Sequence, residues 1–124
     1  MNIKEVCEKF NISQDTLRYY EKVGVIPPVN RTAGGIRDYN EADLGWVQNA
    51  VCMRDAGMSV EKLVEYVELF QQGEQTLAAR RDLLKEVREE MLEARAKYDS
   101  AIERLDYKIG KYEEAVETGV LVWD

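Results

Sequence analysis

The 124 residues suit one small domain with one extended element, because single domains usually contain about 100 to 200 residues. A formal net charge of -7 argues against a protein that binds nucleic acid through bulk charge. Residues 1–58 hold seven Lys/Arg against eight Asp/Glu, and residues 59–124 hold ten against sixteen, so the acidity lies in the second half. Any nucleic-acid contact made by the first half must therefore come from a few well-placed cations.

Two cysteines, Cys7 and Cys52, and no histidine leave too few ligands for a zinc site, and we expect no metal and no cofactor. Without histidine or a phosphate-binding glycine motif, the chain is not expected to be an enzyme. The longest purely apolar run covers only residues 120–123, so we expect neither a signal peptide nor a membrane span. Two free thiols suit a reducing cytoplasm.

Two short helices are predicted at the start of the chain. The spacing i, i+3, i+4 and i+7 marks the buried stripe of the first helix, formed by Ile3, Val6, Cys7 and Phe10. Ser13 is a suitable N-cap for the second helix, and Gly24 can end it in a left-handed conformation. The short connection over residues 11–13 predicts a helix-turn-helix.

The second helix carries an unusual outer face. Leu17 and Tyr20 share its inner face, whereas Arg18, Tyr19 and Lys22 lie together on the other side. Two cations beside an aromatic hydroxyl indicate a contact surface, and the alternative for Lys22 is a solvated charge without a contact.

A glycine-turned hairpin follows this helix pair. Residues 29–31 and 36–39 flank the turn at residues 33–35, and two antiparallel strands are predicted there. An isolated hairpin is marginally stable, so we expect it to lean on the helices as a wing. The hairpin brings Arg31 and Arg37 close together.

Two further helices are predicted after the hairpin, the first capped by Asn40 and the second by Ser59. Gly57 and Gly73 can end them. Cys52 lies out of phase with the apolar residues of its own helix, on the side occupied by Gly45, Gln48 and Asn49.

Residues 76–117 are predicted to form one long helix. A column of apolar residues seven apart runs along it, and consists of Leu77, Leu84, Met91, Tyr98, Leu105 and Tyr112. A second column contains Val87, Ala94 and Ala101 and then, after a stutter, Ile102, Ile109 and Val116. Such a helix is about 60 Å long, and its stripe needs a partner helix, most simply from a second copy. We therefore divide the chain into residues 1–73, the dimerisation helix 76–117 and a short tail 118–124, to which no role is assigned.

This layout resembles the MerR family of bacterial transcription regulators over almost the whole chain. The most specific motifs are T-L-R-Y-Y-E at 16–21, G-I-R-D-Y at 35–39 and R-D-A-G-M-S at 54–59. Ile36 departs from the pattern, because the family usually has an aromatic residue there.

The resemblance implies a mostly α fold, with a winged helix-turn-helix followed by a long dimerisation helix that forms an antiparallel coiled coil in a homodimer. The two recognition helices would enter successive major grooves of double-stranded promoter DNA, about 34 Å apart. Members of the family bend and untwist an overlong promoter spacer so that RNA polymerase can read it. The positions that it implies for DNA contact are Thr16, Arg18, Tyr19, Arg31, Arg37 and Tyr39. Lys22 is added to them from the outer face of the second helix.

The sequence leaves the inducer open. Metal-sensing members carry cysteines near the start and beyond the end of the long helix, and this sequence has none there. The context of Cys52, C-M-R-D-A-G, resembles the thiol-based, aldehyde-responsive branch, which implies a thiol sensor in a stress response. The alternatives are a packed Cys52 without chemistry, a regulator with no effector, and a coiled-coil adaptor that binds protein instead of DNA.

Overall fold

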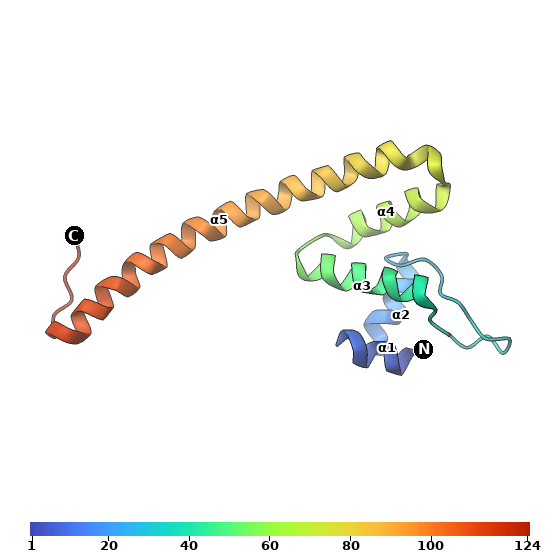
Figure 1. Ribbon diagram of the computed structural model, residues 1–124, viewed down its shortest axis with the longest axis horizontal. Coiled ribbons are helices and arrows are strands. Elements are labelled where there is room, and N and C mark those ends of the chain that lie inside the picture. The colour runs from blue at the N-terminus through green and yellow to red at the C-terminus, as the bar shows by residue number, and fades with distance from the viewer. The chain divides into compact units, whose positions relative to one another are not determined.

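The computed structural model describes residues 1–124 and consists of helices joined by short connections, with no regular β-strand (Figure 1). Two compact units, Met1–Val87 and Arg88–Asp124, divide the chain within its last helix. The α-helices are α1 (Ile3–Phe10), α2 (Gln14–Val23), α3 (Glu41–Asp55), α4 (Val60–Gln72) and α5 (Leu77–Thr118), with one 3-10 turn, η1 (Glu74–Thr76), before α5.

The helix ends in the first unit follow the predicted capping residues. The side chains of Ser13, Asn40 and Ser59 each accept a hydrogen bond from the backbone N–H three residues later, which confirms all three N-caps. Gly24 ends α2 with a φ of 90°, a left-handed conformation that a side chain would oppose. The boundaries of the helix-turn-helix are thus set by local chemistry.

One apolar core joins these helices. Cys7 and Tyr20 are buried in it, as their positions on the inner faces of α1 and α2 predict. Its largest fully buried side chains are Val6, Leu17, Val25, Ile26, Val47 and Leu63. Leu83 and Val87 from the first turns of α5 are also buried, so this compact unit includes the start of α5.

The wing is a hairpin turn without the predicted strands. A single antiparallel bridge joins Arg31 to Arg37, and the Thr32 N–H donates to the Ile36 carbonyl at 2.8 Å across the turn. The wing is fastened instead by side chains: Asp43 of α3 accepts from the Asn30 N–H at 3.0 Å. The prediction of two strands was therefore wrong, because a two-stranded ribbon with no third strand beside it gains little from extending its ladder.

The second unit contains the rest of α5 and the tail. The helix continues through Gly110 and leaves its heptad stripe uncovered in the single chain. Between 52% and 84% of each side chain is exposed for Tyr98, Ile102, Leu105, Ile109, Tyr112 and Val116. A stripe of this length is typical of a surface that a partner covers. None of the helices is both long and apolar enough to span a membrane.

Candidate nucleic-acid interface

The outer face of α2 presents the cations and the aromatic ring that its periodicity predicts. Tyr19 is 48% exposed and Lys22 is also exposed, whereas Leu17 and Tyr20 are buried beneath them. The neighbouring tyrosines therefore separate as predicted, Tyr19 to the surface and Tyr20 to the core. Arg18 is held along the helix, because its Nη2 donates to Gln14 Oε1 at 3.1 Å. Its remaining N–H groups can turn to a base edge or a phosphate.

Thr16 lies in the first turn of α2 and completes its N-cap. The Ser13 hydroxyl donates to Thr16 Oγ1 at 2.8 Å and accepts from the Thr16 N–H at 3.0 Å. This pair fixes the start of the helix that carries Arg18 and Tyr19. Thr16 is half-buried and oriented by its local bonds.

Glu21 connects α2 to the wing. Its carboxylate accepts from Arg37 Nε at 2.7 Å and from the Val29 N–H at 2.9 Å, and Arg31 Nη2 lies 3.7 Å away. Only 10% of the Glu21 side chain is exposed. One carboxylate therefore holds both wing arginines beside α2, whereas the sequence predicts only that the two arginines lie close together.

The environment of Glu21 keeps it ionised. Burial by itself would raise the pKa of its carboxyl group, but the hydrogen bonds from Arg37 and Val29, with the charges of Arg37 and Arg31, lower the pKa below its ordinary value. Arg31 is the more accessible wing cation, and its Nη1 donates to the Gly35 carbonyl at 2.9 Å. The wing thus presents a positioned cation next to α2.

Tyr39 does not occupy the surface position that the sequence analysis assigned to it. Its side chain is 2% exposed, and its hydroxyl is enclosed without a hydrogen-bond partner. Burial raises the pKa of this phenol, and the nearby charge of Arg37 offsets only part of that effect. The backbone N–H of Tyr39 donates to the Met1 carbonyl at 2.7 Å, and the Met1 amino group donates to the Tyr39 carbonyl at 2.9 Å, so the backbone of Tyr39 is tied to the start of the chain. We therefore leave Tyr39 out of the interface.

The two cysteines differ in accessibility. Cys7 is buried, and desolvation raises the pKa of its thiol, with Arg18 opposing the shift only in part. Cys52 is exposed on α3, so the structure does not support the alternative in which it is simply packed. Its thiol is open to a reagent from solvent.

Glu21 is the residue of this candidate interface that the sequence did not single out. One sequence feature could have indicated its role. Glu21 is the only carboxylate in T-L-R-Y-Y-E, and the helix that carries this motif is followed by a turn with two arginines that need a partner. A carboxylate near two guanidinium groups favours bidentate or shared pairing, and pairing of this kind fixes a mobile hairpin.

A helix-turn-helix, an exposed Arg-Tyr-Lys face on its second helix and a flanking wing with placed arginines define a winged helix-turn-helix DNA-binding protein. Residues 1–69 match the family described as MerR HTH family regulatory protein. The chain belongs to the MerR family of transcription regulators, whose members are not enzymes.

Similar proteins extend this assignment beyond the first domain. The chain is 48% identical to the transcriptional regulator AdhR of Bacillus subtilis (strain 168) over 93 residues, which are 75% of this chain and 66%, just under two thirds, of AdhR. A MerR family regulator of Listeria monocytogenes has a similar crystal structure, with 43% identity and a TM-score of 0.91 over 96% of this chain and 90% of its own. The structure of HiNmlR, described as a MerR family regulator lacking the sensor domain and bound to promoter DNA, matches with 28% identity, a TM-score of 0.86 and coverage of 97% and 95%. The chain is thus similar to the AdhR and NmlR branch of the family.

Proposed function

We propose that two copies of this chain bind a pseudo-palindromic operator, with α2 of each copy in the major groove and the wing against the flanking backbone. The observation that carries this proposal is the exposed face of Arg18, Tyr19 and Lys22, with Arg31 held beside it through Glu21. Arginine can fork two bonds to guanine, and a tyrosine hydroxyl can donate to phosphate. HiNmlR, with a similar fold, is described as bound to promoter DNA, which supports the same role here.

The dimer in this proposal pairs the α5 helices antiparallel through their heptad stripe. Its support is the apolar stripe on α5, of which Tyr98, Ile102, Leu105, Ile109 and Val116 are all more than half exposed in the single chain. Two recognition helices spaced by such a coiled coil match half-sites about 34 Å apart. Twofold symmetry also explains how a nearly neutral domain achieves binding, because each set of contacts is used twice.

The regulatory step in the proposal is promoter remodelling. Bound to an overlong spacer, the dimer bends and untwists the DNA so that RNA polymerase engages both promoter elements. Bending of this size costs about 1 to 6 kcal/mol, which the protein must recover through its backbone contacts. The wing, fixed to α2 through Glu21, is suited to hold the DNA in that shape.

Reactive aldehydes are the inducers we propose, acting through Cys52. The thiolate adds to the carbonyl carbon and the carbonyl oxygen takes up a proton, so that a hemithioacetal forms without any oxidant. The exposed position of Cys52 and the similarity to AdhR support this assignment. An adduct on α3 lies in the helix that anchors the wing through Asp43, which gives it a path to the DNA-binding surface.

Arg18→Ala is expected to weaken operator binding by at least about tenfold, because a bidentate arginine contact contributes about 1 to 3 kcal/mol. The measurement is a fluorescence-anisotropy titration on the promoter beside this gene, at several salt concentrations. Lys85→Ala, which removes an exposed cation from α5, is the matched control and should bind like the wild type. Equal affinities for wild type and Arg18→Ala, or a wild type without an operator footprint, would contradict the proposal.

Formaldehyde or methylglyoxal is expected to modify Cys52 and to spare Cys7, because Cys7 is buried and its raised pKa keeps it protonated. Intact-mass and peptide mass spectrometry of the folded protein measure this selectivity. Cys52→Ser should lose both the adduct and the aldehyde response in a reporter assay. If it responds like the wild type, Cys52 is not the sensor.

A further inference from the structure

The connection between α4 and α5 is a tight corner, which we call the α4–α5 corner and define as residues 73–80. Gly73 opens it with a φ of 102° and a ψ of -168°, a conformation that is essentially restricted to glycine. The 3-10 turn η1 follows, and its Thr76 is only 7% exposed although it is polar. After the corner, the first turns of α5 return alongside α4 (Figure 1). The corner thus joins the helices of the first unit to the helix that is proposed for dimerisation.

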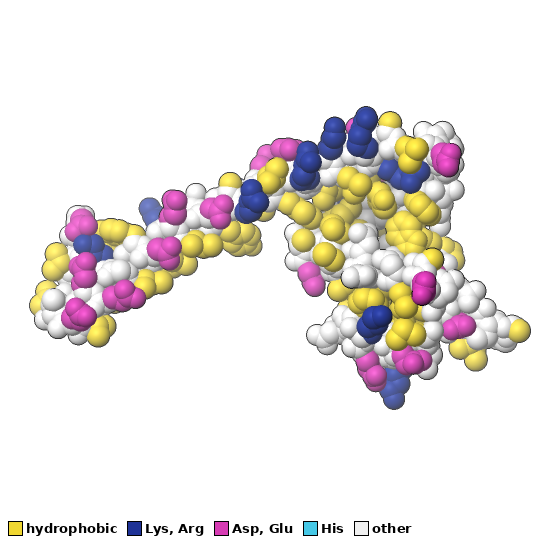
Figure 2. Space-filling view, viewed as in Figure 1, with side chains coloured by type: hydrophobic (Ala, Val, Ile, Leu, Met, Phe, Trp, Pro, Cys, Tyr) yellow, Lys and Arg dark blue, Asp and Glu magenta, His cyan; other side chains and the backbone are white.

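Apolar contacts and one ion pair hold the first turns of α5 along α4. Leu83 and Val87 of α5 are buried in the core of the first unit. Lys62 Nζ on α4 donates to Glu86 Oε1 at 3.0 Å. Figure 2 shows hydrophobic side chains where the start of α5 faces the rest of the first unit, and Lys and Arg side chains on its outer side. Apolar contacts are not directional, so a precise direction for α5 also needs directional bonds.

The α4–α5 corner supplies these directional bonds as one network. The Gly73 carbonyl accepts from the Thr76 N–H at 3.1 Å and from Arg80 Nη2 at 3.1 Å. Thr76 Oγ1 lies 2.7 Å from the same carbonyl and 2.6 Å from the Leu69 carbonyl, and it can donate its single proton to either of them. The same hydroxyl accepts from Arg80 Nε at 3.0 Å. Groups from α4, η1 and α5 are thereby joined, so a rotation at the corner breaks several bonds at once.

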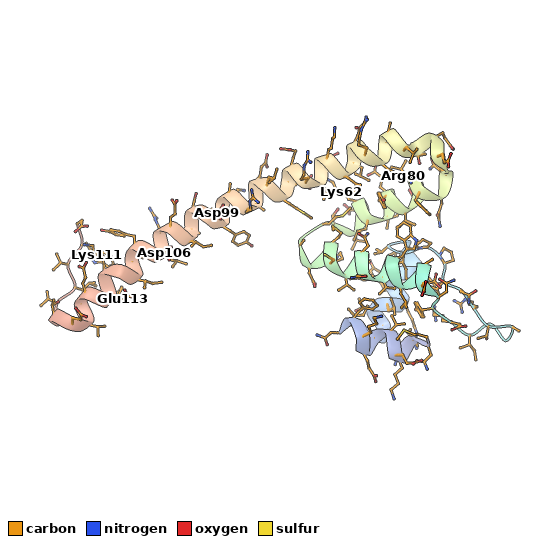
Figure 3. All side chains as sticks on the ribbon, in the orientation of Figure 1. Lys62, Arg80, Asp99, Asp106, Lys111 and Glu113 are labelled. Atoms are coloured by element: carbon orange, nitrogen blue, oxygen red, sulfur yellow. The ribbon has the colours of Figure 1, made fainter.

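Arg80 is explained by the corner and not by its own helix. It lies in the first turn of α5, which contains no acidic residue, and a cation there is opposed by the positive end of the helix dipole. In Figure 3, Arg80 lies between the start of α5 and the end of α4. The end of α4 favours a cation, because its last carbonyl groups carry partial negative charge. The guanidinium carbon is also 5.4 Å from the centre of the Phe70 ring on α4.

The direction of α5 at this corner matters for DNA binding by the proposed dimer. There α5 is held by the other copy through the heptad stripe, whereas α2 belongs to the first unit, which the chain leaves through the corner. A rotation of about 10° moves a point about 20 Å away by about 3.5 Å, and about 20 Å is the scale of a domain of this size. Base pairs are about 3.4 Å apart along the duplex, so such a rotation shifts α2 by about one base pair.

We propose that Thr76 and Arg80 are positioning residues that set the half-site spacing of the operator, because they lock the α4–α5 corner and hold the two copies of α2 at one separation. This inference rests on the proposed homodimer on two half-sites and adds to it a rule for the distance between them. A locked corner rejects an operator that is one base pair longer or shorter. On a spacing that it accepts, the DNA and not the protein changes shape. A loose corner lets each α2 follow its half-site.

Arg80→Met tests this role, because methionine can still pack on Phe70 but donates no hydrogen bond. The measurement is an anisotropy titration of the full chain on the operator beside this gene and on versions with one base pair inserted or deleted at its centre. The wild type is expected to lose at least about tenfold in affinity on the altered spacings, and Arg80→Met less than about threefold, because only a locked dimer must deform the DNA to fit. Thr76→Val should behave like Arg80→Met, and Thr76→Ser, which keeps the hydroxyl, like the wild type.

Arg81→Met is the matched control and should keep the wild-type ratio of affinities, because Arg81 is exposed and its Nε donates to the neighbouring Asp82 at 3.0 Å. A loss of stability alone lowers the affinity for every spacing equally, so the ratio of affinities separates positioning from folding. If the wild type binds its operator while Arg80→Met and Thr76→Val keep its ratio, the spacing role is wrong and the proposed function stands. A wild type that stays monomeric or binds no operator overturns the proposed function and the spacing role together.

Discussion

Leu105→Glu is expected to convert the dimer into a folded monomer at micromolar concentrations and to weaken operator binding by at least about a hundredfold. Leu105 is 55% exposed in the single chain, so the substitution costs the isolated chain little. In the dimer each copy loses about 2 kcal/mol of apolar burial, or about 4 kcal/mol for the pair. That loss corresponds to about a thousandfold in dissociation constant, and DNA affinity falls because one half-site no longer assists the other. Sedimentation velocity and an anisotropy titration on the full operator measure the two effects.

Ser100→Glu is the matched control for this prediction. It introduces the same charge at an exposed position on the face of α5 opposite the heptad stripe, so it should remain dimeric and bind DNA normally. Circular dichroism should still show a folded first unit in both variants, because residues 100 and 105 lie outside Met1–Val87. If Leu105→Glu remained a dimer, pairing through the stripe would be wrong.

Local rules explain why so much of the helical fold was predictable from the sequence. Ser13, Asn40 and Ser59 cap their helices through bonds to N–H groups only three residues away, and such bonds depend on nothing else in the chain. The burial of Cys7 and the opposite orientations of Tyr19 and Tyr20 follow from helical periodicity alone. These features are fixed by spacing, and spacing can be read directly.

The features that escaped prediction depend on contacts between distant residues. Tyr39 is buried and bonded through its backbone to Met1, and the wing is held by Glu21 and Asp43 in place of a β-ladder. The sequence alone assigns no role to the tail, because the bond between Lys111 and Asp124 joins residues thirteen apart across the end of α5. No periodic pattern reports which side chain will satisfy a remote donor.

The proposed DNA interface depends on the positions of a few charges, because the first half of the chain carries no net positive charge that could attract DNA. Two of its four cations, Arg31 and Arg37, share the carboxylate of Glu21. This pairing weakens the attraction of the two arginines to DNA phosphates. It also restricts the conformations of the wing before DNA binds. An interface of this kind gains affinity through preorganisation, so it is sensitive to the residue that organises it.

Glu21→Ala is expected to lower the stability of the first unit by about 2 kcal/mol and its melting temperature by about 10 °C. The substitution leaves the buried Val29 N–H without an acceptor and the Arg37 guanidinium without its carboxylate. Operator affinity should fall at least about tenfold as well, because the wing arginines are no longer held beside α2. Glu8→Ala, which removes an exposed carboxylate from α1, is the control and should change neither quantity. Thermal unfolding by circular dichroism and an anisotropy titration measure the two effects.

The pH dependence of the Glu21 contribution separates its charge from its packing. The pKa of Glu21 is lower in the folded protein than in the unfolded chain, where the pKa of a glutamate is about 4.3. The stabilisation is therefore fully present above the unfolded pKa and is lost as the pH falls through the lower folded pKa. The difference in melting temperature between wild type and Glu21→Gln should be largest near neutral pH and should shrink on acidification below about pH 4. A difference in melting temperature that stays constant over this range would mean that Glu21 holds the wing through packing and not through its charge. The ion pairs with Arg31 and Arg37 would then not be what fixes the wing beside α2.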